Sequence, residues 1–76
     1  MIIRDEFFID ELEKREIETA LRLHSCIDER AMHVIVFAGV VVLRGVARSS
    51  YEKDQAGRIA WSTPGVFNVF NNLTVE

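Results

Sequence analysis

The side chains best suited to bind a metal lie close together near the middle of the chain. His24, Cys26, Asp28 and His33 each carry a donor atom that can coordinate a transition metal. A structural zinc site usually takes four ligands in paired spacing, and these four residues match none of the common zinc patterns. The sequence therefore predicts no metal site.

A nucleophilic site built on Cys26 and His33 is also disfavoured. No third group that could orient the histidine is evident, and nothing in the sequence supplies an oxyanion hole. The four glycines are dispersed and form no phosphate-binding loop. We therefore expect a protein that is not an enzyme, with no catalytic residue and no cofactor.

The distribution of charge limits the class of partner. Residues 1–38 contain five Lys or Arg against nine Asp or Glu, and the whole chain has a formal net charge of -3. A nucleic-acid partner calls for a clustered basic face, so it is not expected here. The cations of the second half, Arg44, Arg48, Lys53 and Arg58, form no run and are a weak signal for contact with lipid phosphates.

Length and composition indicate a single small domain. The chain has 76 residues, and its 49% hydrophobic content is enough for one core. Its first residues lack the basic start and apolar stretch of a signal peptide, and no run approaches the roughly 18 apolar residues of a membrane span. Taken as written, the sequence predicts a soluble, cytoplasmic protein.

A β-hairpin over residues 32–47 is the strongest structural signal. β-Branched and apolar residues run up to Ala38–Gly39 and resume directly after this pair, which is typical of two strands joined by a tight turn. Alternation places Val34, Val36, Val41 and Leu43 on one face of the sheet. The opposite face then carries a second apolar set, which consists of Ile35, Phe37, Val42 and Phe70.

A helix is predicted on each side of this hairpin. Asp10 is a plausible N-cap with Glu13 as its capping-box partner, and strong helix formers continue to about Leu23. Ser49 and Glu52 form a second capping box, so another helix begins there.

The second helix is expected to end before the Pro-Gly pair at residues 64 and 65. A final strand is predicted over residues 66–75. The expected fold is α+β, with the order α-β-β-α-β and two helices packed on one face of a three-stranded mixed sheet. Residues 1–9 are an N-terminal extension of ambiguous structure, and residues 10–76 form the single domain.

With its elements in order, the chain resembles the BON domain, the bacterial osmotic-stress and nodulation module. The specific parts are the GVVVLRG segment at residues 39–45 and the PGV-x-x-V-x-N-x-L-x-V ending at residues 64–75. Supporting matches are Ala20, Leu21, Met32, Val34, Val36, Ser49, Ser50, Glu52, Ala56, Ile59 and Ala60. The resemblance implies a non-catalytic module that associates with phospholipid membranes or envelope proteins. Such modules are often periplasmic, which would apply here if the chain is a fragment.

Exposed aromatic and aliphatic side chains are the candidate contacts with lipid or a partner. Trp61 lies off the apolar stripe of the second helix, and Phe7 and Phe8 lie in the N-terminal extension. The apolar outer face of the sheet is the alternative surface, and it favours a protein-interaction domain or a homodimer. A further alternative is that the N-terminal MIIRDEFFI segment folds over that face.

Overall fold

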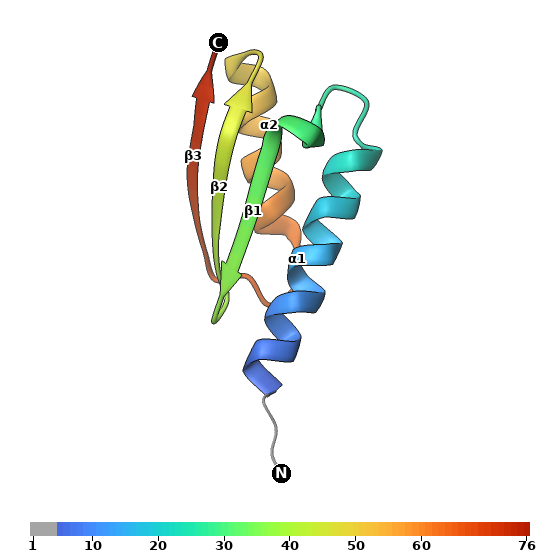
Figure 1. The fold of residues 1–76 in the computed structure, drawn as a ribbon, viewed down its shortest axis with the longest axis vertical. Helices are drawn as coiled ribbons and strands as arrows, with labels where there is room; N and C mark the ends of the chain where they lie inside the picture. Colours follow the sequence, from blue (N-terminus) through green and yellow to red (C-terminus); the bar gives the residue numbers. More distant parts are fainter. Residues whose placement is uncertain (1–4) are drawn as a thin grey trace.

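A computed structural model shows two helices, a short 3₁₀ turn and three strands (Figure 1). It describes the backbone of residues 5–76 and the side chains of residues 10–76. In chain order the elements are α1 (Asp5–Leu23), η1 (Glu29–Ala31), β1 (Met32–Phe37), β2 (Val40–Ala47), α2 (Ser50–Ser62) and β3 (Asn68–Val75). The predicted order α-β-β-α-β is confirmed, and β3 begins two residues later than expected.

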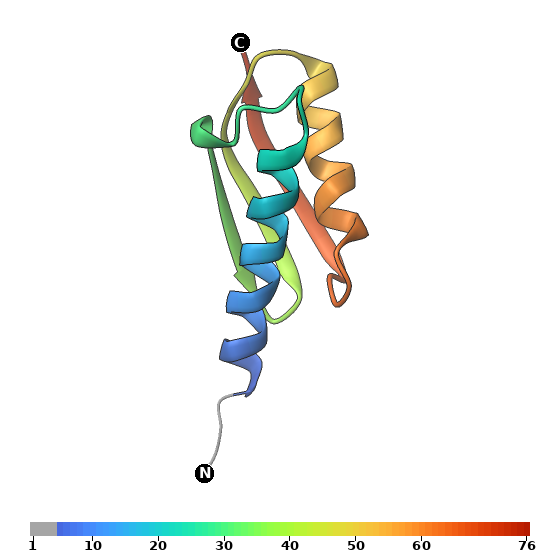
Figure 2. The ribbon, with the colours of Figure 1, turned by 90° about the vertical axis from the view of Figure 1, so that its right-hand side faces the viewer.

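The sheet is mixed and has the order β1-β2-β3. β1 pairs with β2 in antiparallel fashion, and β2 pairs with β3 in parallel. Both helices lie on the same side of this sheet, as the two perpendicular views show (Figures 1 and 2). The α+β architecture predicted from the sequence is therefore confirmed.

The hydrophobic core lies between the sheet and the two helices. Val41, Leu43 and Ala47 of the central strand are completely buried there, because alternate residues of a strand share one face. The helices contribute Ile17, Leu21, Ala56 and Ala60 to the same core. Leu73 of β3 is also buried in it. The outer face of the sheet carries the other side chains of the strands, and no helix within residues 5–76 covers it (Figure 2).

The first helix begins earlier than predicted. α1 starts at Asp5, so Asp10 is not its N-cap, and Glu13 is not the partner in a capping box. Two acidic residues at positions 5 and 6 suit the positive end of the helix dipole and favour the earlier start. Residues 5–9 therefore continue the helix on its own side of the sheet and do not cover the outer face (Figure 2). Residues 1–4 lie outside the described part of the chain.

Asp10 instead supports the turn between β1 and β2. Ala38 and Gly39 both have positive φ, at 51° and 82°, as the central residues of a type I′ turn require. Both carboxylate oxygens of Asp10 lie 3.0 Å from the Ala38 nitrogen and accept its N–H. This charge-assisted bond helps to hold an alanine in a backbone region that L-residues rarely adopt.

Glu52 organises the opposite end of the molecule. The predicted N-cap is confirmed, since the Ser49 hydroxyl accepts the Glu52 N–H at 3.1 Å. The Glu52 carboxylate does not complete a capping box. It accepts the N–H of Arg48 at 2.6 Å and the N–H of Asp28 at 2.7 Å. A single buried carboxylate therefore joins the loop after α1 to the loop before α2.

The free edge of β3 is partly closed by asparagine side chains. The N–H groups of Asn68 and Glu76 donate to carbonyls on the β2 side of β3. Because successive N–H groups of a strand point to opposite edges, the odd-numbered residues between them direct their N–H groups to the free edge. Two of those edge donors are already used. Val69 N–H donates to Asn68 Oδ1 at 3.0 Å, and Leu73 N–H donates to Asn71 Oδ1 at 3.4 Å.

Candidate functional site

The outer face of the sheet is divided into an apolar half and a polar half. The row nearest the β1–β2 turn aligns Phe37 with Val40 and with Asn68, whose amide is its single polar group. The next row aligns Ile35 with Val42 and Phe70. The following row is polar and consists of His33, Arg44 and Asn72. The apolar half therefore lies at one end of the molecule, beside the turn.

Large apolar side chains at this end are well exposed. Phe37 is 72% exposed, Phe70 is 50% exposed and Ile35 is 45% exposed. Phe67, which directly precedes β3, is 70% exposed and lies at the same end. We call these residues together with Val42 the aromatic end. It consists of Ile35, Phe37, Val42, Phe67 and Phe70.

Two neighbouring loops hold the aromatic end together. The Phe67 N–H donates to the Gly39 carbonyl at 2.8 Å, which ties the α2–β3 loop to the β1–β2 turn. The two loops lie side by side at the lower end of the sheet (Figures 1 and 2). Asp10 of α1 accepts the N–H of Ala38 in the same turn. The helix therefore helps to fix the turn that lies between the side chains' two attachment points, Phe37 and Phe67.

A second carboxylate of α1 is buried against the other loop. Glu13 is 5% exposed, and its side chain fills the space beside the Cα of Gly65. Within the described residues its Oε1 atom has no hydrogen-bond partner. Burial, together with the nearby carboxylates of Asp10 and Glu16, raises the pKa of Glu13. Ionised Glu13 is therefore a costly group at this end of the molecule.

The other predicted contact residues lie elsewhere. Trp61 is 53% exposed on α2, which is on the helix side of the sheet and not on the outer face. The backbone of Phe7 and Phe8 belongs to α1, but their side chains lie outside the described residues. The structure thus brings Ile35, Phe37, Val42 and Phe70 together and leaves Trp61 apart from them.

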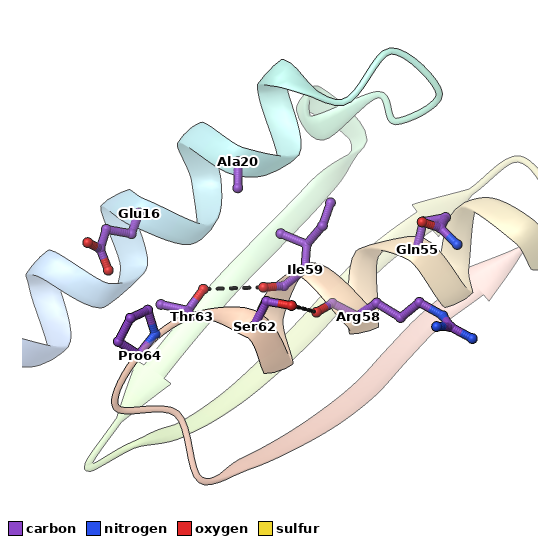
Figure 3. A pocket seen from close by; sticks show the side chains of 8 residues that line it. All are labelled: Glu16, Ala20, Gln55, Arg58, Ile59, Ser62, Thr63 and Pro64. Carbon is purple, nitrogen blue, oxygen red and sulfur yellow. Dashed lines mark hydrogen bonds between the residues drawn. The ribbon is translucent and has the colours of Figure 1, made fainter.

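A shallow groove runs between α1 and α2 (Figure 3). Glu16 and Ala20 line one side of it, and residues of α2 and the following loop line the other. Its two hydroxyls are used by the backbone of the helix, since Ser62 donates to the Arg58 carbonyl and Thr63 donates to the Ile59 carbonyl. The groove presents no hydroxyl paired with a general base.

The residues considered for metal binding or nucleophilic attack include two that contact each other in the loop after α1. Nδ1 of His24 accepts the N–H of Cys26 at 3.2 Å, and Cys26 is an exposed loop thiol. Among residues 10–76, whose side chains are described, no three His, Cys, Asp or Glu residues are grouped so as to hold a metal ion. None of the helices over residues 5–76 has the length and hydropathy needed to cross a bilayer.

Sequence reasoning missed Phe67 as a member of the aromatic end. The expected strand over residues 66–75 assigned Phe67 to regular alternation, which would direct it toward the helices. In the structure β3 begins at Asn68, and Phe67 belongs to the loop after Pro64 and Gly65. This Pro-Gly pair is the signal that could have placed Phe67 in a loop, because loop residues do not follow strand alternation.

Comparison with known proteins identifies the type of domain. No curated protein matches the chain. The family model described as BON domain matches residues 10–76.

Proposed function

The chain belongs to the BON domain family, a family of non-catalytic binding domains, and from this premise we propose that it is a non-enzymatic module that associates with phospholipid membranes through its aromatic end. The observation that supports this surface is the exposure of Phe37, at the end of β1, and of Phe67, in the neighbouring α2–β3 loop, at one end of the sheet. Aromatic side chains at such a position suit the boundary between lipid headgroups and acyl chains.

The size of the aromatic end favours a lipid surface over a tight protein interface. From the exposed fractions, its side chains present roughly 500 Å² of surface. Contiguous apolar patches of this size on small proteins often have a function. A permanent protein interface buries about 1,000 Å² or more on each partner, of which about 65% is apolar, and this is more than the patch offers. Shallow insertion into a bilayer requires no such area.

Vesicle flotation tests the proposal. The wild-type chain should float with vesicles of phosphatidylcholine and with vesicles that also contain phosphatidylglycerol, because the contact is mainly apolar. The double variant Phe37→Ser and Phe67→Ser should bind at least tenfold more weakly, since each lost phenyl ring removes about 2 kcal/mol of apolar transfer energy.

Two outcomes would contradict the proposal. Trp61→Ala is the matched control, because it removes an exposed aromatic side chain from the helix side and should leave flotation unchanged. Binding that depends on Trp61 and not on Phe37 and Phe67 would move the contact to α2. A wild-type chain that does not float, and that forms a dimer dissociated by Phe37→Asp, would replace lipid with a second copy as the partner of the outer face.

A further inference from the structure

Three arginines converge at the end of the molecule opposite the aromatic end. Arg22 comes from the last turn of α1, Arg30 from η1 and Arg48 from the loop between β2 and α2. They line one pocket of about 460 Å³ together with Ser25. The segments that carry them meet at the upper end of the structure, where α1 ends and α2 begins (Figure 1).

Arg48 is fixed in position before any ligand arrives. Its Nε donates to Glu52 Oε1 at 3.2 Å, and its Nη2 donates to the Cys26 carbonyl at 3.1 Å. Glu52 is itself only 2% exposed and accepts two backbone N–H groups, so it is a fixed anchor for the Arg48 side chain. The guanidinium therefore needs little further ordering to bind an anion.

Arg30 is held less firmly than Arg48, since its side chain is 86% exposed. Its Nε donates to Asp28 Oδ1 at 3.2 Å, and the same oxygen accepts the Arg30 N–H at 3.3 Å. In the hydrogen bonds of the described residues, neither terminal nitrogen of Arg30 is used, and the side chain of Arg22 is not used either. A guanidinium anchored through Nε can still offer its terminal N–H groups to an oxyanion.

Positive and negative side chains meet at this pocket. Three arginines line it against two carboxylates, those of Asp28 and Glu29. The carboxylate of Glu52 lies beneath Arg48 and has its oxygens occupied by N–H donors. The three arginines are therefore balanced by the three carboxylates of Asp28, Glu29 and Glu52. Binding of an anion depends on the N–H groups of Arg22 and Arg30 that make no other hydrogen bond within the described residues.

We propose that this arginine pocket binds a phosphate monoester through Arg22, Arg30 and Arg48. A phosphate group offers several acceptor oxygens for the N–H donors of three arginines on separate segments, and arginine recognises it through paired N–H groups. Ser25 adds a hydroxyl to the same lining. The pocket lies away from the aromatic end, so this proposal stands independently of the membrane contact.

Amide chemical shifts during a titration with inorganic phosphate test the proposal. At constant ionic strength, phosphate should cause saturable shifts at Ser25, Ile27 and Arg48 that chloride does not cause, with a Kd on the order of 1 mM. The double variant Arg22→Gln and Arg30→Gln should bind phosphate at least about tenfold more weakly than the wild type, because it removes two charge-assisted donors.

Arg15→Gln is the matched control, since it removes the same charge from an exposed position of α1 outside this pocket. It should bind phosphate as the wild type does. Arg22→Gln alone keeps the pair between Arg30 and Asp28, so a loss of affinity in this variant cannot come from a disturbed loop. Shifts that do not saturate, or that are equal in wild type and Arg22→Gln, would overturn the proposal.

Two further ligands identify the source of the phosphate group. Glycerol 3-phosphate that binds with the same dependence on Arg22 would indicate a soluble ligand. A lipid headgroup would be indicated by vesicles containing phosphatidic acid. Arg22→Gln should then weaken the extra binding that phosphatidic acid provides, and the double variant Phe37→Ser and Phe67→Ser should leave that extra binding unchanged. Failure of flotation with phosphate binding retained would contradict the proposed membrane contact and leave the arginine pocket in place.

Discussion

Two buried carboxylates at opposite ends of the molecule have opposite effects on stability. Burial and neighbouring negative charges raise the pKa of Glu13 above 4.5. Burial also opposes ionisation of Glu52, but the N–H groups of Arg48 and Asp28 and the Arg48 guanidinium outweigh it, so the pKa of Glu52 is lowered. The fold therefore disfavours the charge of Glu13 and favours that of Glu52.

Glu13→Gln is predicted to stabilise the protein at neutral pH. A carboxyl group whose folded pKa is raised contributes stability below 4.5, its unfolded value, and loses it as the pH rises through the folded pKa. Removing the charge should therefore increase the free energy of unfolding at pH 7 by about 1 kcal/mol. Urea denaturation between pH 4.5 and pH 7 should show a flatter profile for the variant than for the wild type.

Glu52→Gln provides the contrast for that experiment. The stability from Glu52 is present above 4.5 and is lost as the pH falls through its lower folded pKa. Its replacement should cost about 2 kcal/mol at pH 7, because one buried N–H group would lose its acceptor. Equal effects of the two variants would show that the assigned environments are wrong. Glu11→Gln, at an exposed position of α1, should change little.

The roles of individual carboxylates were only partly predictable from the sequence. Ser49 and Glu52 have the spacing of a capping box, and the Ser49 cap is present. Asp28, one of the two backbone partners of Glu52, and Ala38, the partner of Asp10, lie 24 and 28 residues away along the chain, so no local pattern could have identified them. Asp10 fits a helix cap equally well by type and spacing, and tertiary contacts with the turn decide its role.

At the scale of elements, the β1–β2 turn combines the right geometry with an unusual residue. A type I′ turn needs positive φ at both central residues, for which Asn-Gly is the favoured pair. Here the first of them is Ala38, whose side chain makes this conformation costly. The turn that carries Phe37 is therefore held by its surroundings, including Asp10, against a local preference.

Substitutions at the two turn positions should have opposite effects. Ala38→Asn should raise the free energy of unfolding by roughly 1 kcal/mol, because asparagine tolerates positive φ better than alanine. Gly39→Ala should lower it, since the added Cβ would lie 3.1 Å from the Gly65 carbonyl oxygen at a φ of 82°. Denaturant midpoints for both variants check this. A loss of stability in Ala38→Asn would mean that the turn is not of this type.

The elements themselves were more predictable than their ends. Alternation in residues 32–47 was enough to separate Val41 and Leu43, which are buried, from Phe37, which is exposed. Periodicity does not identify where a helix begins, so the start of α1 at Asp5 was missed. The same limit placed Phe67 in a strand when it belongs to a loop.

At the scale of the whole molecule, one side of the sheet is a packed core and the other carries an unpartnered apolar half. In an ordinary three-layer domain a further set of helices would cover the second side. Here the side chains of the aromatic end are mostly exposed, so substitutions at these residues should not disturb the packing of the core.

The isolated chain is predicted to be a monomer at tens of micromolar, because a permanent homodimer buries about 1,000 Å² or more on each partner, about 65% of it apolar, and the aromatic end offers only roughly 500 Å². The double variant Phe37→Ser and Phe67→Ser should keep the thermal midpoint within a few degrees of the wild type, since both side chains are largely exposed. Analytical ultracentrifugation and calorimetry check the two statements. A dimer in the wild type, or a collapse of the variant's midpoint, would contradict them.

An exposed apolar face next to an open strand edge is the combination from which cross-β fibrils grow, because each added strand buries side chains and pairs backbone groups at once. The side-chain oxygens (Oδ1) of Asn68 and Asn71 already accept two of the backbone N–H groups at the edge of β3 that an incoming strand would need. The aromatic end can therefore stay exposed while the edge of β3 offers fewer free donors to an incoming strand, and two asparagine side chains provide that protection from within the same strand.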